Sequence, residues 1–566
     1  MSGNRKFLII GSGFSKGLGF PTTKEIESFI SILCRKDCSI DDRISEIEDN
    51  EILELDDIFK QDIKDTLIIL MDDDGKRGLK DIEEKKKKKI NEYINGYKRA
   101  VKSVNEDKLR KHIESLRESY SWETFKSLYQ TFKSDEEIDF SITDMLTIMQ
   151  KLITDRISLN TRDIFDNENK GGVKRDFYDF ISAMNAYKLL MFKIFKNIFR
   201  MNRKINESEV KNYRRIFEHI LDNEIKSQTD IYSIKDLKDT EKRDFYLMNT
   251  GIYTPNWDGI LPFLLMGINR EKNNQFNRVG NRADRKLNLY IDFGITINTC
   301  KLRDGRYTFS FGEETALSIN KLTRKYYDTS RFIIRVVKLF PIHGQFNIRI
   351  CPRCQNPFMF IPDSIGNIAL SNLYRNFVID PLPNEEDFNF YRDYKLSEEA
   401  YSIGEPDYLK CPRCNYNTCF KDSYLEIQSI LKPRIDNVLN KIYFEYADFF
   451  GNSDHIISIG YSFPRDDFVE NYHLKIMSIK GDRVNRPNMS VILYNKSMQD
   501  KEWYSLNEAE KRLKSNYENN SDNLETINVL KKITNKNKVR ISFMGFPDIL
   551  ERVKNTNEIM EYKPVE

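Results

Sequence analysis

The length of this chain, 566 residues, exceeds what one ordinary hydrophobic core holds and predicts two or three domains. Its 90 basic and 87 acidic residues nearly balance, which excludes a protein that binds nucleic acid or membranes through its overall charge. No segment of signal-peptide form opens the sequence, and lysines interrupt the most apolar predicted helix, at residues 188–196. We therefore expect a cytoplasmic protein with no membrane contact and no direct nucleic-acid binding.

The first predicted element is a strand that ends in a turn rich in glycine and serine. The apolar run 7–10 favours a strand, and Gly11-Ser-Gly-Phe-Ser15 after it favours a tight turn. Glycines let backbone N–H groups approach a ligand closely, so the turn is suited to a dinucleotide pyrophosphate. The third glycine of the Rossmann spacing is missing, so a plain turn after a buried strand is an equally good interpretation. Thr22 and Glu25 are spaced as a capping box and predict a helix over 23–33, packed against the sheet.

Between about residues 41 and 240 the composition changes. Proline is absent, and apolar residues recur at spacings of three and four, which predicts an inserted helical domain. Its candidate helices cover Glu51 to Met71, Ser141 to Ile153 and Asp176 to Met201. The five lysines Lys85 to Lys89 have the charge to contact phosphates, but two glutamates precede them on the same predicted helix. A solvated helix face is the favoured interpretation of this run.

The sheet is predicted to resume with the aromatic and β-branched stretch 245–253, which runs into Thr-Pro-Asn256-Trp-Asp258. In doubly wound folds the working side chains lie on loops at the carboxyl ends of strands, so Asn256 and Asp258 are placed for chemistry. An Asx turn that caps the apolar helix predicted from Ile260 to Met266 accounts for the same residues equally well.

Polar or turn-forming residues also follow three later apolar runs, which are typical of parallel strands buried on both faces. These residues are His343, Gly460 with Ser462, and Asn495. The Gly460 turn has the composition for a second phosphate or ribose contact. A histidine beside a glycine is, by itself, more often a hydrogen-bonded turn residue than a catalyst.

Two cysteine pairs, Cys351-Pro-Arg-Cys354 and Cys411-Pro-Arg-Cys414, supply the closed tetrahedral set of thiolates that a structural zinc requires. The stretch between them is longer than in an ordinary zinc ribbon, so we expect an insertion between residues 358 and 407. Eight cysteines in so long a chain suit reduced thiols and a metal better than a disulfide framework. Cys419 is a substitute ligand candidate.

In order and composition, these motifs resemble those of sirtuins. They are most similar to the divergent sirtuin-like proteins of bacterial anti-phage defence, in which G-x-G-x-S, T-x-N-x-D, a His-Gly pair and G-Y-S-F-P mark the nucleotide site. The resemblance covers the opening residues and roughly the second half of the chain. It implies an α/β fold with a Rossmann-type parallel sheet, a helical insertion and a small zinc-ribbon module. The implied boundaries are 1–40, 241–345 and 425–566 for the sheet domain, 41–240 for the insertion and 346–424 for the zinc module.

The resemblance also implies an activity, the hydrolysis of NAD to nicotinamide and ADP-ribose. Asn256 would position the attacking water, Asp258 would fix the ribose or nicotinamide, and His343 would accept a proton. The implied nucleotide contacts are Gly11, Ser12, Gly13, Ser15, Pro21, Gly460, Ser462 and Asn495. The N-glycosidic bond already carries a cationic leaving group, so its cleavage needs positioning more than a strong acid.

Two departures from the sirtuin pattern separate hydrolysis from protein deacylation. Pro255 stands where deacetylases carry glutamine, and the acyl-lysine strand V-x-F-G-E is missing between Leu431 and Phe450. We therefore expect water to be the acceptor, with a deacylase as the alternative and a non-catalytic sensor of NAD or ADP-ribose as a second alternative. The family further implies a homo-oligomer, and as a possible partner a hexameric DNA-translocating ATPase of the HerA type. The helical insertion is placed to gate the site or to assemble subunits.

Overall fold

The computed structural model describes most of the sheet domain and the helical region, and parts of the segment between residues 286 and 436. The described residues are 5–35, 38–71, 79–100, 105–133, 141–161, 173–201, 207–228, 250–279, 286–292, 298–303, 306–310, 332–351, 353–354, 356–361, 380, 382, 384, 386–387, 414, 424–425, 437–464, 467, 471–476, 487–515, 521–553 and 556–565.

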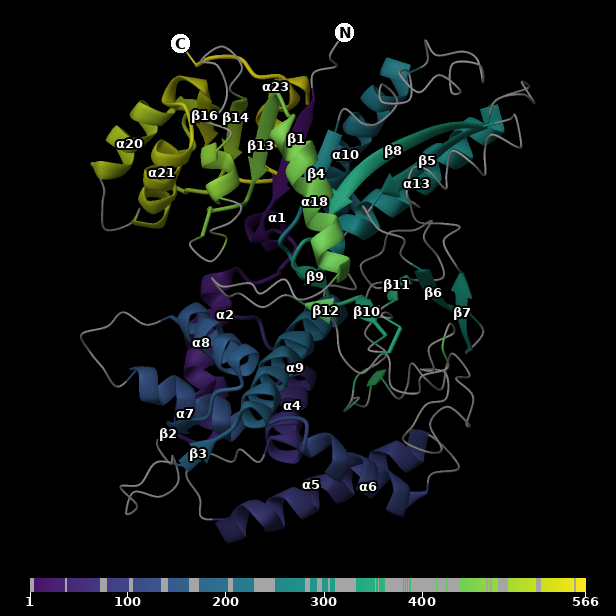
Figure 1. Ribbon diagram of the computed structural model, residues 1–566, viewed down its shortest axis with the longest axis vertical. Helices are drawn as coiled ribbons and strands as arrows, with labels where there is room; N and C mark the ends of the chain where they lie inside the picture. The colour runs from purple at the N-terminus through teal and green to yellow at the C-terminus, as the bar shows by residue number, and fades with distance from the viewer. Residues whose placement is uncertain are drawn as a thin grey trace.

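An eight-stranded sheet forms the upper half of the molecule (Figure 1). In spatial order its strands are β15 (Tyr504–Ser505), β16 (Val539–Ser542), β14 (Asn488–Ile492), β13 (His455–Ile459), β1 (Lys6–Ile10), β4 (Thr250–Tyr253), β8 (Phe332–Phe340) and β5 (Lys286–Asp292). Every neighbouring pair is parallel except β15 with β16. Strands β13 and β4 are buried along their whole length, as is typical of parallel strands that are covered on both faces. The predicted α/β class with a parallel sheet is confirmed.

At the central strand, β1, the order in which strands are added to the sheet reverses. From β1 the chain adds β4, β8 and β5 on one side and then returns to add β13, β14 and β16 on the other. In open α/β sheets, such a reversal leaves a crevice outside the carboxyl ends of the two strands where it occurs. The topology therefore places a crevice beyond the ends of β1 and β13.

Helices pack around this sheet. They are α10 (Glu207–Gln228), α13 (Ile260–Val279), α18 (Asn437–Gly451), α20 (Leu506–Lys514), α21 (Ser521–Ile533), and the short α1 (Ser12–Lys16), α22 (Ile549–Arg552) and α23 (Asn557–Met560), with a 3-10 turn at Lys536–Lys538. The α18 rings of Tyr446 and Phe450 pack edge-on against Phe7 of β1, with ring centroids 5.6 and 4.9 Å apart. Helix α10 belongs to the predicted insertion, yet it lies beside the sheet, where Tyr213 packs edge-on against Phe14 at 5.0 Å.

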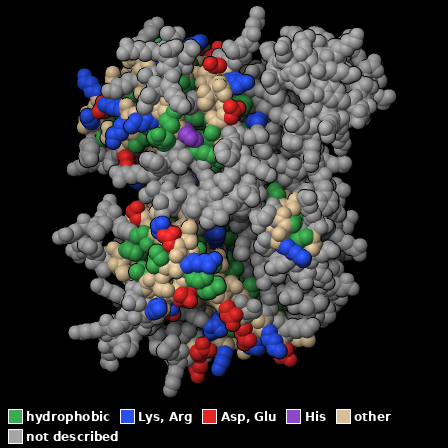
Figure 2. Space-filling model, viewed as in Figure 1, with side chains coloured by type: hydrophobic (Ala, Val, Ile, Leu, Met, Phe, Trp, Pro, Cys, Tyr) green, Lys and Arg blue, Asp and Glu red, His purple; other side chains and the backbone are tan. Residues whose placement is uncertain are grey.

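A helical lobe lies below the sheet in Figure 1. Its helices are α2 (Thr23–Leu33), α3 (Ile40–Asp49), α4 (Asp57–Asp65) continued by a π-helical turn (Thr66–Leu70), α5 (Leu79–Ala100), α6 (Glu106–Arg117), α7 (Trp122–Lys133), α8 (Ile142–Asp155) and α9 (Phe177–Met201). A two-stranded ribbon of β2 (Leu159–Thr161) and β3 (Val173–Arg175) lies at its edge. Acidic and basic side chains are interspersed at the bottom of this lobe (Figure 2), in keeping with the balanced charge of the chain.

Local signals placed these helices well. Thr22 and Glu25 form the predicted capping box at the start of α2, and Ser141 forms another with Asp144 before α8. The prediction that residues 51–71 form one helix is wrong, because α4 begins only at Asp57, whose preceding residue Asp56 caps it.

The expectation that α2 packs against the sheet is also wrong. Its hydrogen-bond partners are helices of the lobe: Tyr129 of α7 donates to Ser31 Oγ at 2.7 Å, and Arg43 of α3 donates to the Leu33 carbonyl at 2.9 Å. Turn geometry after Gly19, whose φ is +81°, directs the chain away from the sheet before α2 begins.

The ammonium groups of the lysine run on α5 either pair with carboxylates of the protein or lie in solvent. Lys86 is buried and pairs with Glu83 at 3.2 Å, while Lys89 pairs with Asp65 at 3.4 Å. Lys87 and Lys88 are exposed. The solvated-face interpretation of this run therefore describes its exposed side, and its buried side contributes to packing.

A buried ion network joins α9 to α4 and to a segment near residue 380. The Lys193 ammonium group lies 2.7 Å from carboxylate oxygens of both Asp62 and Asp380. Lys196 lies 2.5 Å from Asp380 and also contacts Asp387. The side chains of these residues, which we call the α9 ion network, are at most 4% exposed. Because each charge has an opposite partner, the network ties three distant parts of the chain together.

The remaining strands form small sheets near the base of β8. A four-stranded sheet has the order β10 (Ile348–Ile350), β11 (Pro357–Ile361), β6 (Asn298–Arg303) and β7 (Arg306–Ser310), and a two-stranded sheet pairs β12 (Tyr424–Leu425) with β9 (Gly344–Gln345). Among the helices that the structure describes, none has both the length and the apolar character needed to cross a membrane.

Candidate functional site

A pocket opens at the carboxyl ends of β1, β4 and β13, where the sheet topology places a crevice. It holds about 670 Å³ of empty space, part of which is open to solvent. The predicted site residues that line it are Ser12, Ser15, Pro21, Asn256, Asp258, His343 and Ser462. They come from four separate stretches of the chain, which the fold brings to one pocket.

Asn256 and Asp258 are tied to the first turn of the chain. The Ser15 hydroxyl donates to Asp258 Oδ2 at 2.6 Å, and Asn256 Nδ2 donates to the Gly11 carbonyl at 2.9 Å. Asn256 Nδ2 also lies 3.3 Å from Ser15 Oγ. These contacts fix the loop after β4 against the loop after β1. None of these three hydrogen bonds involves the amide oxygen of Asn256.

Asp258 caps a helix and also lines the pocket. Its Oδ1 accepts a hydrogen bond from the Ile260 N–H at 2.8 Å, so it caps α13, while its Oδ2 faces Ser15. Burial raises the pKa of Asp258 to about 6, although the hydrogen bonds from Ser15 and Ile260 act in the opposite direction. A carboxylate whose pKa is raised in a pocket is a typical mark of a functional site.

His343 follows β8 by three residues and is 6% exposed. Its Nε2 lies 3.4 Å from Oδ1 of Asp467, and Asp467 Oδ2 accepts a hydrogen bond from the Tyr461 hydroxyl. Both Asp467 and Tyr461 line the pocket. The histidine therefore faces a carboxylate on the turn that follows β13.

The glycines of the two turns have a role that the sequence did not predict. Gly11 and Gly13 N–H groups donate to the carbonyls of Ile459 and Gly460, each at 2.9 Å. A Cβ on Gly460, which has φ of +62°, would lie 2.3 Å from the Phe14 nitrogen, so only glycine fits. In this structure these two N–H groups bind the neighbouring turn, and a pyrophosphate would use other donors of the site, such as the Ser12 and Ser462 hydroxyls.

Asn495 lies apart from the pocket lining. It is 7% exposed, and its Oδ1 accepts hydrogen bonds from the Ser497 N–H and hydroxyl at 2.9 and 2.7 Å. This is an Asx turn that follows β14 by three residues, so the structure gives the side chain a local role. Its predicted contact with the adenosine end stays a prediction.

Several residues that line the pocket were not predicted from the sequence. Asp467 lies just beyond the Gly460-Tyr-Ser-Phe-Pro464 motif, and the acidic pair that ends this stretch is a signal that points to it. Phe195 of α9 also lines the pocket and packs against Phe20 with ring centroids 5.8 Å apart. No local signal identifies Phe195, because it lies within an apolar helical stripe that predicts only burial.

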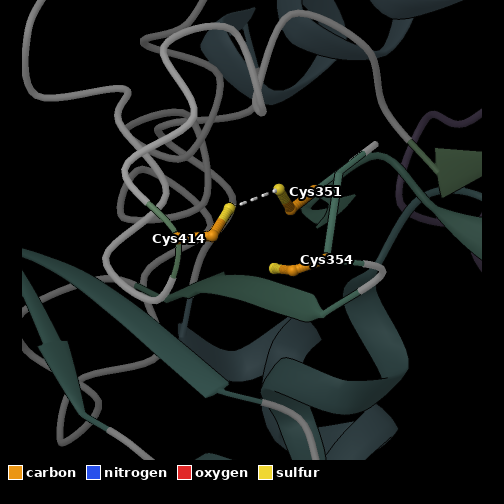
Figure 3. Close-up of side chains that lie close together, drawn as sticks. All are labelled: Cys351, Cys354 and Cys414. Atoms are coloured by element: carbon orange, nitrogen blue, oxygen red, sulfur yellow. Dashed lines mark hydrogen bonds between the residues drawn. The ribbon is translucent and has the colours of Figure 1, made fainter.

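Three predicted metal ligands lie together at the other candidate site (Figure 3). The sulfurs of Cys351, Cys354 and Cys414 are all within 4.8 Å of one another, and those of Cys351 and Cys414 are 3.6 Å apart. Thiolates on a tetrahedral zinc, at ~2.3 Å from the metal, are separated by roughly 3.8 Å. The three thiols can therefore hold a metal ion. Cys411, the fourth predicted ligand, and Cys419 lie outside the described residues.

The surroundings of these cysteines also suit a bound metal. Asn356 Nδ2 lies 3.1 Å from the Cys354 sulfur and 2.9 Å from the Cys354 carbonyl, and the Cys351 N–H donates to the Asn356 carbonyl at 3.0 Å. Hydrogen bonds of this kind orient ligands around a metal. A comparison with known proteins gives no guide to either site, since no family model and no curated protein matches this chain.

Proposed function

We propose that this protein hydrolyses NAD to nicotinamide and ADP-ribose in the pocket beyond β1, β4 and β13. The observation that carries the proposal is the convergence of Asn256, Asp258 and His343 in one pocket with the serines of two turns. The pocket's position at the switch point of a parallel sheet is where such folds bind nucleotides. The order of the motifs, which resembles that of sirtuin-like defence proteins, points to NAD within that class.

The reaction balances with water as the only second substrate. The bond between ribose C1′ and the nicotinamide nitrogen breaks, and its electron pair stays on that nitrogen. A water oxygen forms the new bond to C1′ and loses one proton to His343. Because the nicotinamide ring leaves as a neutral molecule, no strong acid is needed, and the protein's contribution is to position water and ribose.

Each side chain has a position that suits one part of this step. Asn256 is fixed through its amide nitrogen, so its oxygen is suited to accept a hydrogen bond from the attacking water. Asp258 is a buried carboxylate without a cationic partner in its hydrogen-bond set, which suits it to a ligand that becomes more positive. A ribose that develops oxocarbenium character is such a ligand.

Two features favour water over an acyl-lysine peptide as the acceptor. Pro255 lines the pocket where a deacetylase would have glutamine. Residues 437–451 form α18, a helix, in the part of the chain where a deacetylase would have its peptide-binding strand. The proposed activity is therefore hydrolase rather than deacylase activity, and a role as an NAD-depleting effector in defence is the corresponding biological hypothesis.

We also propose that the three clustered cysteines, with Cys411, hold a structural Zn²⁺. The donor set is made only of thiols, which suits a closed tetrahedral site rather than one with an open position for catalysis. The ion would crosslink β10 and its following turn to the segment that contains Cys414.

The test of the proposed activity is the chromatographic measurement of nicotinamide and ADP-ribose released by the purified protein. His343→Ala and Asn256→Ala should each lower the rate by ~10²-fold or more, as expected for loss of a base or a water-orienting group. A parent protein that binds NAD without consuming it would support the sensor alternative instead. Release of O-acyl-ADP-ribose with an acyl-lysine peptide would support the deacylase.

A further inference from the structure

The carboxylate of Asp467 is shared between two pocket side chains. One oxygen lies 3.4 Å from His343 Nε2, and the other accepts a hydrogen bond from the Tyr461 hydroxyl. Asp467 is 2% exposed and His343 is 6% exposed. In so buried a place a carboxylate interacts strongly with a neighbouring imidazole, because little water screens the pair.

An aromatic frame holds this arrangement. The ring of Tyr253 is edge-on to the His343 ring, with centroids 6.5 Å apart, and edge-on to the Tyr461 ring at 6.2 Å. Tyr253 is 1% exposed and belongs to β4 at the centre of the sheet. The imidazole is therefore confined between a rigid ring and a carboxylate.

We propose that Asp467 is the positioning residue of His343: it favours the tautomer with the proton on Nε2, leaves Nδ1 as the basic nitrogen, and stabilises the imidazolium. The proposal rests on the proposed NAD hydrolase activity for its catalytic meaning. A carboxylate beside one ring nitrogen fixes which nitrogen carries the proton, as in the serine protease triad.

Asp467 is better placed for this role than the other pocket carboxylate. The oxygens of Asp258 accept hydrogen bonds from Ser15 and from the Ile260 N–H, so they face the β1 turn and α13. Among the contacts described above, the other titratable groups beside His343 or Asp467 are the phenols of Tyr253 and Tyr461. A phenol does not balance an imidazolium at neutral pH. Asp467 is thus the negative charge that can accompany proton uptake by His343.

In the hydrolysis step the proton released by water passes to Nδ1 of His343. The positive charge that results lies on a ring whose other nitrogen is 3.4 Å from Asp467 Oδ1. Burying such a charge without a counter-charge is costly, so the carboxylate makes proton uptake easier. Tyr461 keeps the carboxylate in place through its hydroxyl.

The experiment is a pH titration of His343 followed by NMR in protein carrying ¹³Cε1-labelled histidine. The chain has five histidines, and the His343→Gln variant assigns the signal of interest. Asp467→Asn should move the titration midpoint of His343 to lower pH by ~1 unit or more, since an opposite charge within a few ångströms has effects of this size. The same variant should lose ~10²-fold or more of NAD turnover.

The matched control is Asp500→Asn. Asp500 also accepts a hydrogen bond from a tyrosine, Tyr504, but it lies on the surface, with 56% of its side chain exposed, and it does not line the pocket. This variant should leave the His343 midpoint and NAD turnover unchanged. Asp467→Glu keeps the negative charge, so its His343 midpoint should stay close to that of the parent protein. Asp467→Ser provides a second neutral variant if Asp467→Asn does not fold.

An unchanged His343 midpoint in a folded neutral variant overturns the proposal, whatever its turnover. A lower midpoint in a protein that never consumes NAD would support the pairing and reject the hydrolase. The titration thus separates the failure of this inference from the failure of the proposed function.

Discussion

The pocket and the α9 ion network are both buried and polar, yet they compensate charge in different ways. Helix α9 connects them, because Phe195 lines the pocket while Lys193 and Lys196, on either side of it in the sequence, belong to the network. In the network, carboxylates meet ammonium groups at 2.5–2.7 Å. In the pocket, Asp258 has only neutral hydrogen-bond donors around its oxygens.

This difference shows in the pKa of one carboxylate from each place, Asp62 in the network and Asp258 in the pocket. Burial would raise the pKa of Asp62, but the charges of Lys193 and Lys196 outweigh it and lower this pKa to about 2. Burial raises the pKa of Asp258 to about 6, and within the described residues the opposing influences are hydrogen bonds from Ser15 and Ile260, which are neutral. A buried charge that is balanced contributes to structure, whereas one that is left unbalanced costs stability and indicates a site kept for a ligand.

We expect the largest effect at the cysteine cluster, where a metal ion would compensate the negative charge of the thiolates. If the cysteine cluster binds zinc as proposed, Cys354→Ser should abolish zinc binding and lower the free energy of unfolding of the surrounding small sheet, because zinc binding contributes several kcal/mol or more to such modules. Metal analysis and calorimetry measure both quantities. Cys38→Ser, at a half-buried cysteine outside the cluster, is the control and should keep the zinc. A Cys354→Ser protein with unchanged zinc would refute the assignment.

Next in size is the loss of a cation from the network. Lys193→Met should lower the free energy of unfolding by ~3–5 kcal/mol, because it leaves buried carboxylates with one ammonium group fewer. Lys64→Met removes an ion pair between α4 and the exposed Asp41 of α3, and should cost less than ~1 kcal/mol. Urea unfolding followed by circular dichroism compares the two. Equal costs would mean that the network is not balanced by its lysines.

The pocket should respond to substitution in the opposite direction. Asp258→Asn removes a buried charge that lacks a cation, and an asparagine oxygen can still cap α13. We expect this variant to be as stable as the parent at pH 7.5, or more stable by up to ~3 kcal/mol, while losing ~10²-fold of NAD turnover. A variant that is both less stable and fully active would place Asp258 with the structural carboxylates.

The pH dependence of that stability difference follows from the sign of the pKa shift. The pKa of Asp258 in the folded protein, about 6, lies above the ordinary value of 3.8, so the folded state binds more protons than the unfolded state between these values. Its contribution to the free energy of unfolding therefore falls as the pH rises through this window. The advantage of Asp258→Asn over the parent should grow from pH 4 to pH 6 and then level off, which unfolding curves at several pH values can show.

The smallest effect distinguishes two carboxylates inside the network. Asp62 has a lowered pKa, while burial raises the pKa of Asp380, which shares its lysines with Asp62 and Asp387. Neutralising Asp380 should therefore cost less stability than neutralising Asp62, by ~1 kcal/mol or more. The comparison of Asp62→Asn with Asp380→Asn by urea unfolding tests this order, and the reverse order would contradict it.

Much of the fold followed from local sequence signals. The capping box at Thr22 marked the start of α2 because it satisfies backbone N–H groups within one turn, and apolar spacing placed the start of α8 at Ser141. Strands β13 and β14 were identified by their content of isoleucine and valine, because parallel strands are buried on both faces. The gathering of Asn256 and His343 in one pocket was also predictable, since the carboxyl ends of parallel strands meet at one edge of the sheet.

Contacts between segments far apart in the chain were decided only by the tertiary structure. The position of α2 among helices, the reach of Phe195 into the pocket and the facing of Asp467 toward His343 depend on packing that no local pattern records. The role of Gly460 belongs here as well, because the need for glycine comes from the backbone of Phe14 lying against it. The sequence alone determined which residues end which strands. Packing determined which of their charges are balanced, because the partner of a buried charge is chosen by proximity in space.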